Sequence, residues 1–394
     1  MLSPKKRFAR YWTLAIASAL VAVGCAACGS SDSQSSPGGA NSTEAGAKCT
    51  AEAQKRYEAD SLADPTAPIP APTTPVDASG MAGKRVALIS GSQSVPVVKN
   101  TINAVQSALA KAGIKADVFD TKSQVSLQAQ TFSQVVGQHY DAIYMDGVDP
   151  TAVTAGTKAA AAAGIPIVAA GEYPNDSSKY PVLPDLYAMI LTNDKGTGKT
   201  KADYALWKTN CGGGNGQYAV MTVDYGLFKV SLQSTLDEIK SVCPGCSAKS
   251  YQIDFVHDIV GSSRANALAA VNQNPNLSGI LTADVWSIYQ AEAVHQSANG
   301  KNVPFFSEEA TPDGLPLVKS GQVAADLNTT SSSAYAAWTG ADLVVRGLAG
   351  QKLANEVTSL PLSMVTADVA GRLPSFNDDF QSLQPEFLKL WGIK

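Results

Sequence analysis

The chain has 394 residues, of which 45% are hydrophobic and 16% charged. It is therefore long enough for two domains and too apolar to be disordered throughout. Its 30 Lys and Arg residues against 34 Asp and Glu give a net charge of −4. A chain of this charge offers no basic surface for nucleic acid, so no nucleic-acid partner is expected.

The N-terminus has the pattern of a bacterial export signal. Four basic residues at positions 5, 6, 7 and 10 precede an uncharged apolar run over residues 12–24, which is too short to span a membrane. The run ends at Cys25 and resembles a lipobox, in which a small residue precedes a cysteine that becomes acylated. We therefore expect a signal peptide over residues 1–24 and a lipid anchor on Cys25, at the outer face of the cell membrane. Cys28 is the alternative lipidation site, although Gly24 and Val23 suit Cys25 better.

Residues 25–83 are predicted to form a flexible tether. The segment is rich in Ser, Gly, Ala, Pro and Thr, with five prolines between positions 65 and 75. Such a composition buries too little apolar surface to offset the entropy of ordering. Within it, residues 49–57 are the one stretch expected to form a short helix that docks on the body.

From Lys84 onward, short apolar runs alternate with helical patterns. Pro96 opens a helix whose apolar positions are spaced by 4, 3 and 4 residues before Gly113 ends it. Strands separated by helices of 10–16 residues imply parallel sheets with right-handed crossovers, so the fold class is α/β with two doubly wound lobes. The expected strands are 86–90, 116–119, 142–145, 165–169 and 189–192 in the first series, and 218–223, 251–255, 279–282 and 303–306 in the second.

Four segments of the chain are similar to the type I periplasmic binding proteins, and most of all to the ribose-binding-like receptors of sugar importers. They are residues 87–96, 163–168, 191–204 and 311–314. The resemblance implies two lobes joined by three hinge strands, a sugar-type ligand in the cleft between them, and docking to the permease subunits of an ABC transporter. The resulting division is an N-terminal lobe of residues 84–192 and 330–360, a C-terminal lobe of residues 193–329 and 361–369, and a tail of residues 370–394.

Ligands of doubly wound sheets bind beyond the carboxyl ends of the strands, so the loops after the strands hold the candidate site. Their Asp, Glu, Ser and aromatic side chains suit a ligand with hydroxyl groups and an apolar face. With the hinge positions, the predicted ligand-binding residues are Ser92, Ser94, Val97, Asp146, Glu172, Asp224, Tyr225, Asp284, Trp286, Glu309, Asn328 and Thr329.

The match to the family's ligand site is uneven. Val97 and Val98 stand where many members have two aromatic residues, so Trp286 and Tyr225 are the candidates for stacking on a sugar; the alternative is that either packs in its own lobe. The arginines that usually neutralise the site are absent from the matching positions, which predicts a cleft with uncompensated acids. Such a cleft favours a sugar, polyol or amino sugar and rejects sugar acids and phosphates.

No catalytic, metal or cofactor site is expected. The histidines at positions 139, 257 and 295 have no metal-ligand spacing. Residues 196–200 lack the first glycine of a phosphate loop, and no nucleophile lies next to a base. We therefore expect a monomeric, non-enzymatic receptor without a cofactor. A ligand-sensing partner of a membrane signalling protein is the alternative, and an exported hydrolase is the third.

The four cysteines beyond the lipobox are disulfide candidates, as expected of an exported chain. They are Cys49, Cys211, Cys243 and Cys246. The Cys243-Pro-Gly-Cys246 motif follows a helix and precedes a strand, which is the reverse of a thioredoxin-type site. Two arrangements remain open: Cys211 pairs with Cys243 or Cys246, or else Cys49 pairs with Cys211 and Cys243 with Cys246.

Overall fold

The computed structural model describes residues 43–61, 72–171, 173, 183–254, 257–308, 314–327, 330–352, 357–359, 362, 364–373 and 375–393. The chain divides into two units, Met1–Gly39 and Ala40–Lys394, and every helix and strand below belongs to the second. The expected signal peptide, Cys25 and Cys28 lie outside the described residues. None of the helices in the described part is both long and apolar enough to cross a membrane.

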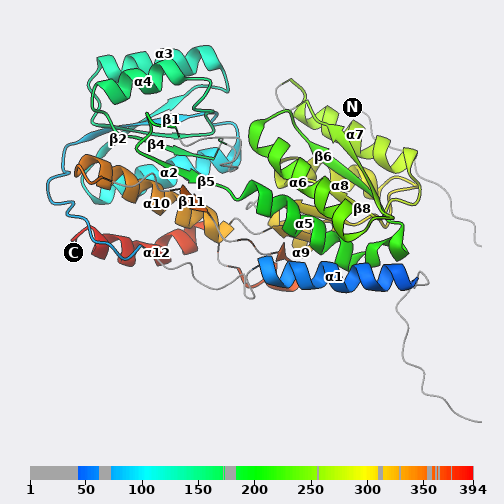
Figure 1. Cartoon of the computed structure of the whole chain (residues 1–394). Coiled ribbons are helices and arrows are strands. Elements are labelled where there is room, and N and C mark those ends of the chain that lie inside the picture. Colours follow the sequence, from blue (N-terminus) through cyan, green and yellow to red (C-terminus); the bar gives the residue numbers. More distant parts are fainter. Residues whose placement is uncertain are drawn as a thin grey trace, which may run out of the picture. The chain divides into compact units, whose positions relative to one another are not determined.

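The first lobe is built on a parallel sheet of six strands (Figure 1), in the order β11-β5-β4-β3-β1-β2. Every strand pair in it is parallel. The strands are β1 (Arg85–Ser90), β2 (Lys115–Asp120), β3 (Ala142–Asp146), β4 (Ile167–Ala170), β5 (Ala188–Leu191) and β11 (Val357–Ser359), and the helices are α2 (Pro96–Lys111), α3 (Val125–Gly137), α4 (Thr154–Ala162) and α10 (Thr330–Leu348). The inner strands β1, β3, β4 and β5 are nearly continuous buried apolar runs because helices cover both faces, whereas the edge strand β2 is mostly exposed.

The second lobe repeats this plan with the order β12-β10-β9-β8-β6-β7, in which only β12 runs antiparallel. The strands are β6 (Gln217–Thr222), β7 (Ser247–Gln252), β8 (Gly279–Leu281), β9 (Phe305–Glu308), β10 (Ala325–Leu327) and β12 (Met364–Val365). The helices are α5 (Asp194–Lys208), the 3₁₀ turn η1 (Asn210–Gly214), α6 (Gly226–Val242), α7 (Ile259–Gln273), α8 (Asp284–His295), α9 (Leu315–Lys319) and α11 (Ala367–Ala370). The expected α/β architecture with two doubly wound lobes is confirmed.

Several strand positions differ from the sequence prediction: β4 begins two residues later than expected, and β10, β11 and β12 were not predicted. The strand expected at 251–255 lies at Ser247–Gln252, because β7 is an edge strand whose positions are mostly exposed and polar. Its Ser and Lys residues interrupt the apolar pattern from which buried strands are predicted. The strand expected at 303–306 lies two residues later, at Phe305–Glu308, so that Glu308 belongs to the strand rather than to the loop.

Helix α1 (Glu44–Asp60) packs on the second lobe and corrects the expected extent of the tether. Its buried residues Gly46, Cys49 and Ala53 are spaced by 3 and 4 and form one face of the helix. The side chain of Thr43 caps the helix by accepting from the backbone N–H of Gly46, and its hydroxyl donates to the carbonyl of Gly213. The predicted short helix at 49–57 is therefore a longer helix, and the tether does not extend through it.

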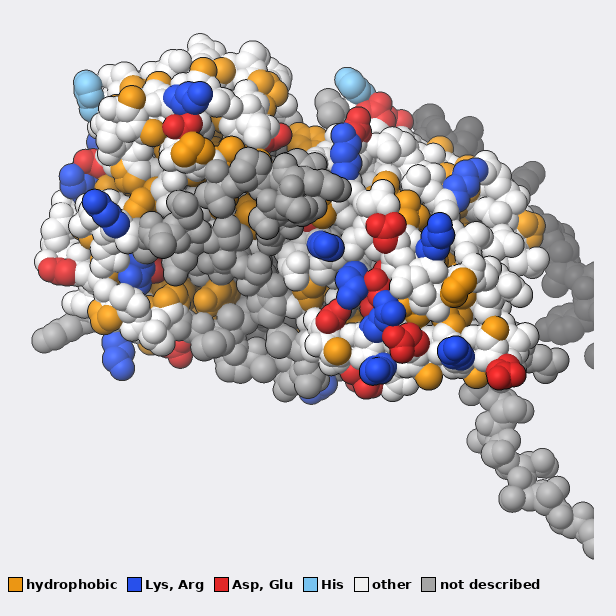
Figure 2. Space-filling view, viewed as in Figure 1, with side chains coloured by type: hydrophobic (Ala, Val, Ile, Leu, Met, Phe, Trp, Pro, Cys, Tyr) orange, Lys and Arg blue, Asp and Glu red, His pale blue; other side chains and the backbone are white. Residues whose placement is uncertain are grey.

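Charged side chains gather where α1 meets α5 and α6, in the lower part of the second lobe (Figure 2). Arg56 lies 2.8 Å from both Glu52 and Glu238, and Lys199 lies 2.9 Å from Asp60. Beneath them Asp203 is fully buried, and neither of its carboxylate oxygens has a hydrogen-bond partner among the described residues. Burial and then the charge of Glu238 raise the pKa of Asp203 to about 8, against the opposing effects of Lys199 and Arg56.

This pKa predicts that the protein loses stability as the pH rises from about 4 to 8. The folded state holds a proton on Asp203 that the unfolded state releases near pH 3.8, so the stabilisation is complete below that pH and is lost through pH 8. An Asn side chain has the same shape as a protonated Asp but does not titrate. We therefore expect the stability of Asp203→Asn to change little between pH 4 and 8. At pH 8 the variant should be more stable than the wild type by a few kcal/mol, since each unit of pKa shift corresponds to about 1.4 kcal/mol.

Denaturant midpoints of the wild type and Asp203→Asn across pH 4–9 test this expectation. Asp237→Asn is the matched control, since Asp237 is exposed on the neighbouring helix α6 and accepts from Gln233 alone among the described residues. A wild-type profile that rises between pH 5 and 8, or one that Asp203→Asn leaves unchanged, would contradict a raised pKa of Asp203.

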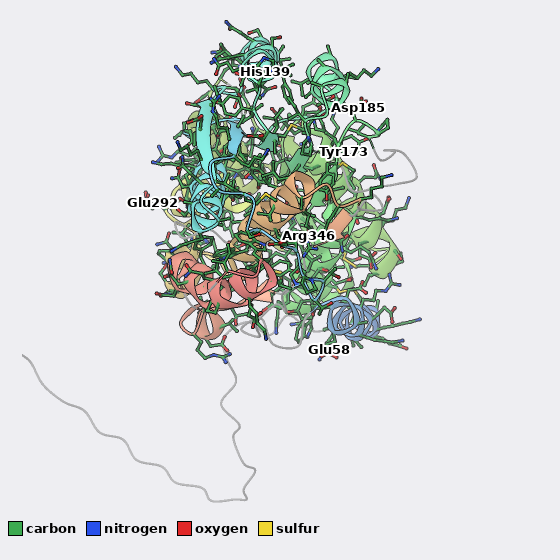
Figure 3. All side chains as sticks on the ribbon, turned by 90° about the vertical axis from the view of Figure 1, so that its left-hand side faces the viewer. Glu58, His139, Tyr173, Asp185, Glu292 and Arg346 are labelled. Atoms are coloured by element: carbon green, nitrogen blue, oxygen red, sulfur yellow. A yellow bond between two sulfur atoms is a disulfide. The ribbon has the colours of Figure 1, made fainter. Side chains whose placement is uncertain are left out.

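The C-terminal helix α12 (Phe376–Leu390) belongs to the first lobe, where it packs on α10. Trp338 of α10 stacks on Phe380 and Phe387, with ring centroids 4.9 and 5.4 Å apart. Arg346, labelled in Figure 3, lies 2.6 Å from Asp342 and also donates to the carbonyl of Thr74. The residues expected as a separate tail are therefore part of the hydrophobic core of this lobe.

Candidate functional site

Each sheet has one point at which its strand order reverses, and ligands of doubly wound folds bind there, beyond the carboxyl ends of the strands. In the first lobe this point lies between β1 and β3, and in the second lobe between β6 and β8. The strands of the first sheet end in register, with Ser90 beside both Asp120 and Asp146. The loops that follow these strands therefore form the candidate site of each lobe.

In the first lobe the loops after β1 and β3 touch through their backbones. The Gly91 N–H donates to the carbonyl of Asp146 at 2.8 Å. A Cβ atom on Gly91 would lie 1.9 Å from the carbonyl oxygen of Gly147, which itself has φ near +70°. Two glycines are thus required here, one for close approach and one for a left-handed turn.

Gly91→Ala is expected to lower the free energy of unfolding by about 3 kcal/mol, because the new methyl group must displace backbone rather than a flexible side chain. The loops after β1 and β3 would separate, so ligand affinity should fall as well. Gly137→Ala is the control, since a Cβ atom there meets nothing within 4 Å and Gly137 ends helix α3. It should be neutral or slightly stabilising. Equal denaturation midpoints for the two variants would refute the packing argument.

Three of the four predicted site residues described in the first lobe lie on these loops or at their edge. Ser92 is buried and Ser94 exposed, and their hydroxyls are hydrogen-bonded at 2.7 Å. Asp146 ends β3 and is 9% exposed. Burial and then the charge of Asp146 raise the pKa of Tyr144, which therefore stays protonated. Val97 is part of α2 and packs partly against the core of the lobe, so it contributes packing beneath the loop.

In the second lobe the predicted residues differ in exposure. Asp224 is 76% exposed at the side chain and forms an ion pair of 2.5 Å with Lys229, while Tyr225 is partly buried against the core. Trp286 is fully buried in the core of its own lobe, 5.1 Å from the ring of Phe228. Trp286 thus packs within its own lobe, which is the alternative to stacking on a sugar.

The remaining predicted site residues cannot be compared with the structure. Asp284 begins α8, but its side chain is not described. The others, Glu172, Glu309, Asn328 and Thr329, lie outside the described residues. They stay predictions.

A buried ion pair lies under the strand ends of the second lobe, and the sequence prediction missed it. The ammonium of Lys201 on α5 donates to Glu308 at the end of β9 and, at 3.2 Å, to the carbonyl of Thr282 after β8. Ser231 of α6 donates to the same Glu308 oxygen at 3.3 Å. Lys201 is 3% exposed and Glu308 4%. The pair thus ties two helices to the carboxyl ends of two strands.

The periodicity of α5 does not reveal this lysine. Residues 200–206 are all buried, charged and apolar alike, so the helix has no single apolar face on which Lys201 would stand out. A buried lysine requires a partner, because an isolated buried charge costs too much free energy. The partner is distant in sequence, so the pairing itself is decided by the tertiary structure.

This lysine compensates one acid at the strand ends, since Glu308 is neutralised by Lys201. The acids expected there without a compensating cation, Glu172, Asp284 and Glu309, stay predictions, because none of their side chains is described. The other described acids at these strand ends are Asp120 at the end of β2, Asp146 at the end of β3, and the solvent-exposed Asp224 after β6, which pairs with Lys229. Carboxylates are therefore present at the strand ends of both lobes.

The cysteines form two disulfides, Cys49–Cys211 and Cys243–Cys246, which is one of the two arrangements that the sequence left open. Cys49, Cys211 and Cys243 are also the one group of His, Cys, Asp or Glu side chains in the described part that is close enough to share a metal ion. As disulfide sulfurs they are not metal ligands in this state.

Two doubly wound α/β lobes, each with polar loops at its switch point, define the class of two-lobe solute receptors. The sequence matches the periplasmic binding protein domain family over residues 86–352, more than half of the chain. The chain therefore belongs to this family of solute-binding proteins. Among curated proteins, no sequence gives a significant match.

Several solved structures share the fold. One is a solute-binding protein of an ABC transporter from Burkholderia graminis in complex with D-arabinose, with 20% identity, a TM-score of 0.60, and coverage of 73% of this chain and 96% of that chain. An arabinose-binding protein from Geobacillus stearothermophilus has 20% identity, a TM-score of 0.58 and coverage of 74% and 99%. A solute-binding protein from Agrobacterium vitis with bound allitol has 17% identity, a TM-score of 0.61 and coverage of 74% and 98%.

Proposed function

We propose that this protein is an extracytoplasmic receptor that captures a sugar or polyol between its two lobes and delivers it to an ABC importer. The observation that carries the proposal is the placement of polar side chains at the switch points of two separate sheets, with Ser92 and Asp146 in the first lobe and Asp224 and Tyr225 in the second. Structural neighbours with bound D-arabinose and allitol support this ligand class.

The charges at the strand ends favour a neutral or cationic ligand. Carboxylates such as Asp146 accept hydrogen bonds from hydroxyl groups, and they repel phosphates and uronates. Because the buried Lys201 is already paired with Glu308, it is not free to neutralise an anionic ligand. Neutral sugars, polyols and amino sugars therefore remain the ligand class, and closure of the lobes on the ligand would shift an open–closed equilibrium.

Mass spectrometry of co-purified small molecules, followed by calorimetry with neutral, cationic and anionic sugars, tests the ligand class. We expect a neutral sugar or polyol to bind, and Asp146→Asn to weaken it by tenfold or more, while the exposed variant Asp237→Asn binds as wild type. At about 100 times the dissociation constant the ligand should stabilise the protein by roughly 2.7 kcal/mol and should reduce its radius of gyration. Tight binding of a sugar phosphate, or the failure of every sugar and polyol, would overturn this assignment.

The proposal also includes a lipid anchor on Cys25, which would hold the protein at the membrane. Acyl chains hold a protein at a bilayer because each buried CH₂ group contributes about 0.8 kcal/mol. Cys25→Ala should therefore move the protein from the membrane fraction to the medium, whereas Cys28→Ala should not. The opposite result would assign the anchor to Cys28.

A further inference from the structure

Four cysteines from three distant parts of the chain meet at one end of the second lobe. Cys49 lies on α1, Cys211 on η1, and Cys243 and Cys246 flank the turn between α6 and β7. The sulfur atoms of Cys49, Cys211 and Cys243 all lie within 4.8 Å of one another. The Cys243 sulfur therefore lies close to the Cys49–Cys211 disulfide while it is itself bonded to Cys246.

The two disulfides differ in accessibility. Cys49, Cys211 and Cys243 are 5%, 0% and 2% exposed, whereas Cys246 is partly exposed on a turn whose Pro244 and Gly245 are open to solvent. A reagent from solution therefore reaches the Cys246 sulfur first and has no direct route to the Cys49–Cys211 bond.

The turn is also seated against the segment that holds Cys211. A Cβ atom on Gly245 would lie 2.4 Å from the carbonyl oxygen of Gly214, and the sulfur of Cys246 lies 3.4 Å from the carbonyl oxygen of Cys211. The sulfur of Cys243 lies 3.6 Å from the Gly214 oxygen. These contacts hold Cys243 beside the buried disulfide.

We propose that Cys243–Cys246 is a thiol–disulfide exchange site through which a dithiol reductant opens the buried Cys49–Cys211 disulfide. In the first step a thiolate of the dithiol attacks the sulfur of Cys246. A mixed disulfide forms, the Cys243–Cys246 bond breaks, and Cys243 leaves as a thiolate beside the second disulfide.

In the second step the Cys243 thiolate attacks the Cys49–Cys211 pair. Attack on Cys211 forms Cys211–Cys243 and releases the Cys49 thiolate, while attack on Cys49 forms Cys49–Cys243 and releases the Cys211 thiolate. The second thiol of the reductant then displaces Cys246 from the mixed disulfide. In total the dithiol loses two electrons and becomes a disulfide, and the protein keeps one disulfide and gains two thiols.

When Cys211 is the sulfur attacked, the result for the fold is release of the covalent link to α1; when Cys49 is attacked, α1 becomes linked to Cys243 instead. Cys49–Cys211 is the covalent link between α1 and the rest of the second lobe. If Cys49 is released, α1 is held on this lobe by its packing and by the ion pairs of Arg56 and Lys199. A dithiol outside the protein could thus change how α1, the helix that precedes the two lobes, is linked to the second lobe.

The first test measures loss of the buried disulfide under native conditions. The oxidised full-length mature protein is treated with dithiothreitol, alkylated at intervals and mapped by mass spectrometry. We expect Cys49–Cys211 to open at least tenfold more slowly in the double variant Cys243→Ser/Cys246→Ser than in the wild type. Equal rates would overturn the proposal, because the buried bond would then be opened without the exposed one.

The second test needs no reductant and separates the two sulfurs of the turn. Cys246→Ser leaves Cys243 as a free thiol, and we expect the mapped protein to contain Cys211–Cys243 or Cys49–Cys243. Cys243→Ser is the matched control, since Cys246 lies outside the group of sulfurs within 4.8 Å and should leave Cys49–Cys211 intact. A Cys246→Ser protein with Cys49–Cys211 alone, or the same exchange in both variants, would contradict the proposed route.

Discussion

Lys201→Met is expected to lower the free energy of unfolding by about 3–5 kcal/mol, because it leaves the Glu308 carboxylate buried without its counter-charge. Glu308 is 4% exposed. Besides Lys201, the described residue that donates a hydrogen bond to its carboxylate is Ser231, through its hydroxyl. Neutral hydrogen bonds of that kind contribute too little to hold a buried charge. Denaturant unfolding of the purified protein measures the loss.

A double variant distinguishes the effect of leaving the Glu308 charge unpaired from the effect of losing the packing of the Lys201 side chain. Lys201→Met/Glu308→Leu removes both charges and keeps an apolar volume, so it should recover most of the stability lost in the single variant. The control is Lys229→Met, which breaks an ion pair that is 59% and 76% exposed at its two side chains. That change should cost less than about 1 kcal/mol. A Lys201→Met variant as stable as Lys229→Met would refute the role assigned to the buried pair.

Removal of the Cys49–Cys211 disulfide by Cys49→Ser/Cys211→Ser is expected to cost about 2–5 kcal/mol. The bond joins residues separated by 162 positions, and cross-links that close long loops restrict the unfolded chain most. The Gly46 backbone packs directly on η1, so α1 should also exchange its amide hydrogens faster once the link is gone. Thermal unfolding and hydrogen exchange over residues 44–60 provide the two measurements.

Cys243→Ser/Cys246→Ser is the matched comparison, because this disulfide spans a separation of 3 residues. Loop closure of that length restricts the unfolded chain little, so we expect a cost of about 1–2 kcal/mol and no change in the exchange of α1. If the short-loop variant were the less stable of the two, loop entropy would not explain the stability of this lobe.

The sequence alone determined the α/β class and the order of the strands from β1 to β9, because these depend on local periodicity, whereas the short strands β10, β11 and β12 were not predicted. Buried parallel strands such as β1 and β3 are continuous apolar runs, and helix α2 shows the 3.6-residue period between its proline and its terminal glycine. It also predicted that the loops of Ser92 and Asp146 follow neighbouring strands, and the structure places both loops at the switch point of the first sheet. The bounds of the edge strand β7 were predicted too late in the chain, because most of its residues are polar.

The tertiary structure decided what depends on contacts between distant residues. Trp286 points into the core of its lobe, and Lys201 meets Glu308 across 107 positions of sequence. Cys49 meets Cys211 because α1 folds back on the second lobe, which converted part of the expected tether into a packed helix. Local propensity cannot specify which of several cysteines or charges become neighbours. That choice follows from how the helices pack on the sheets, where burial of the whole apolar surface outweighs the preference of any single segment.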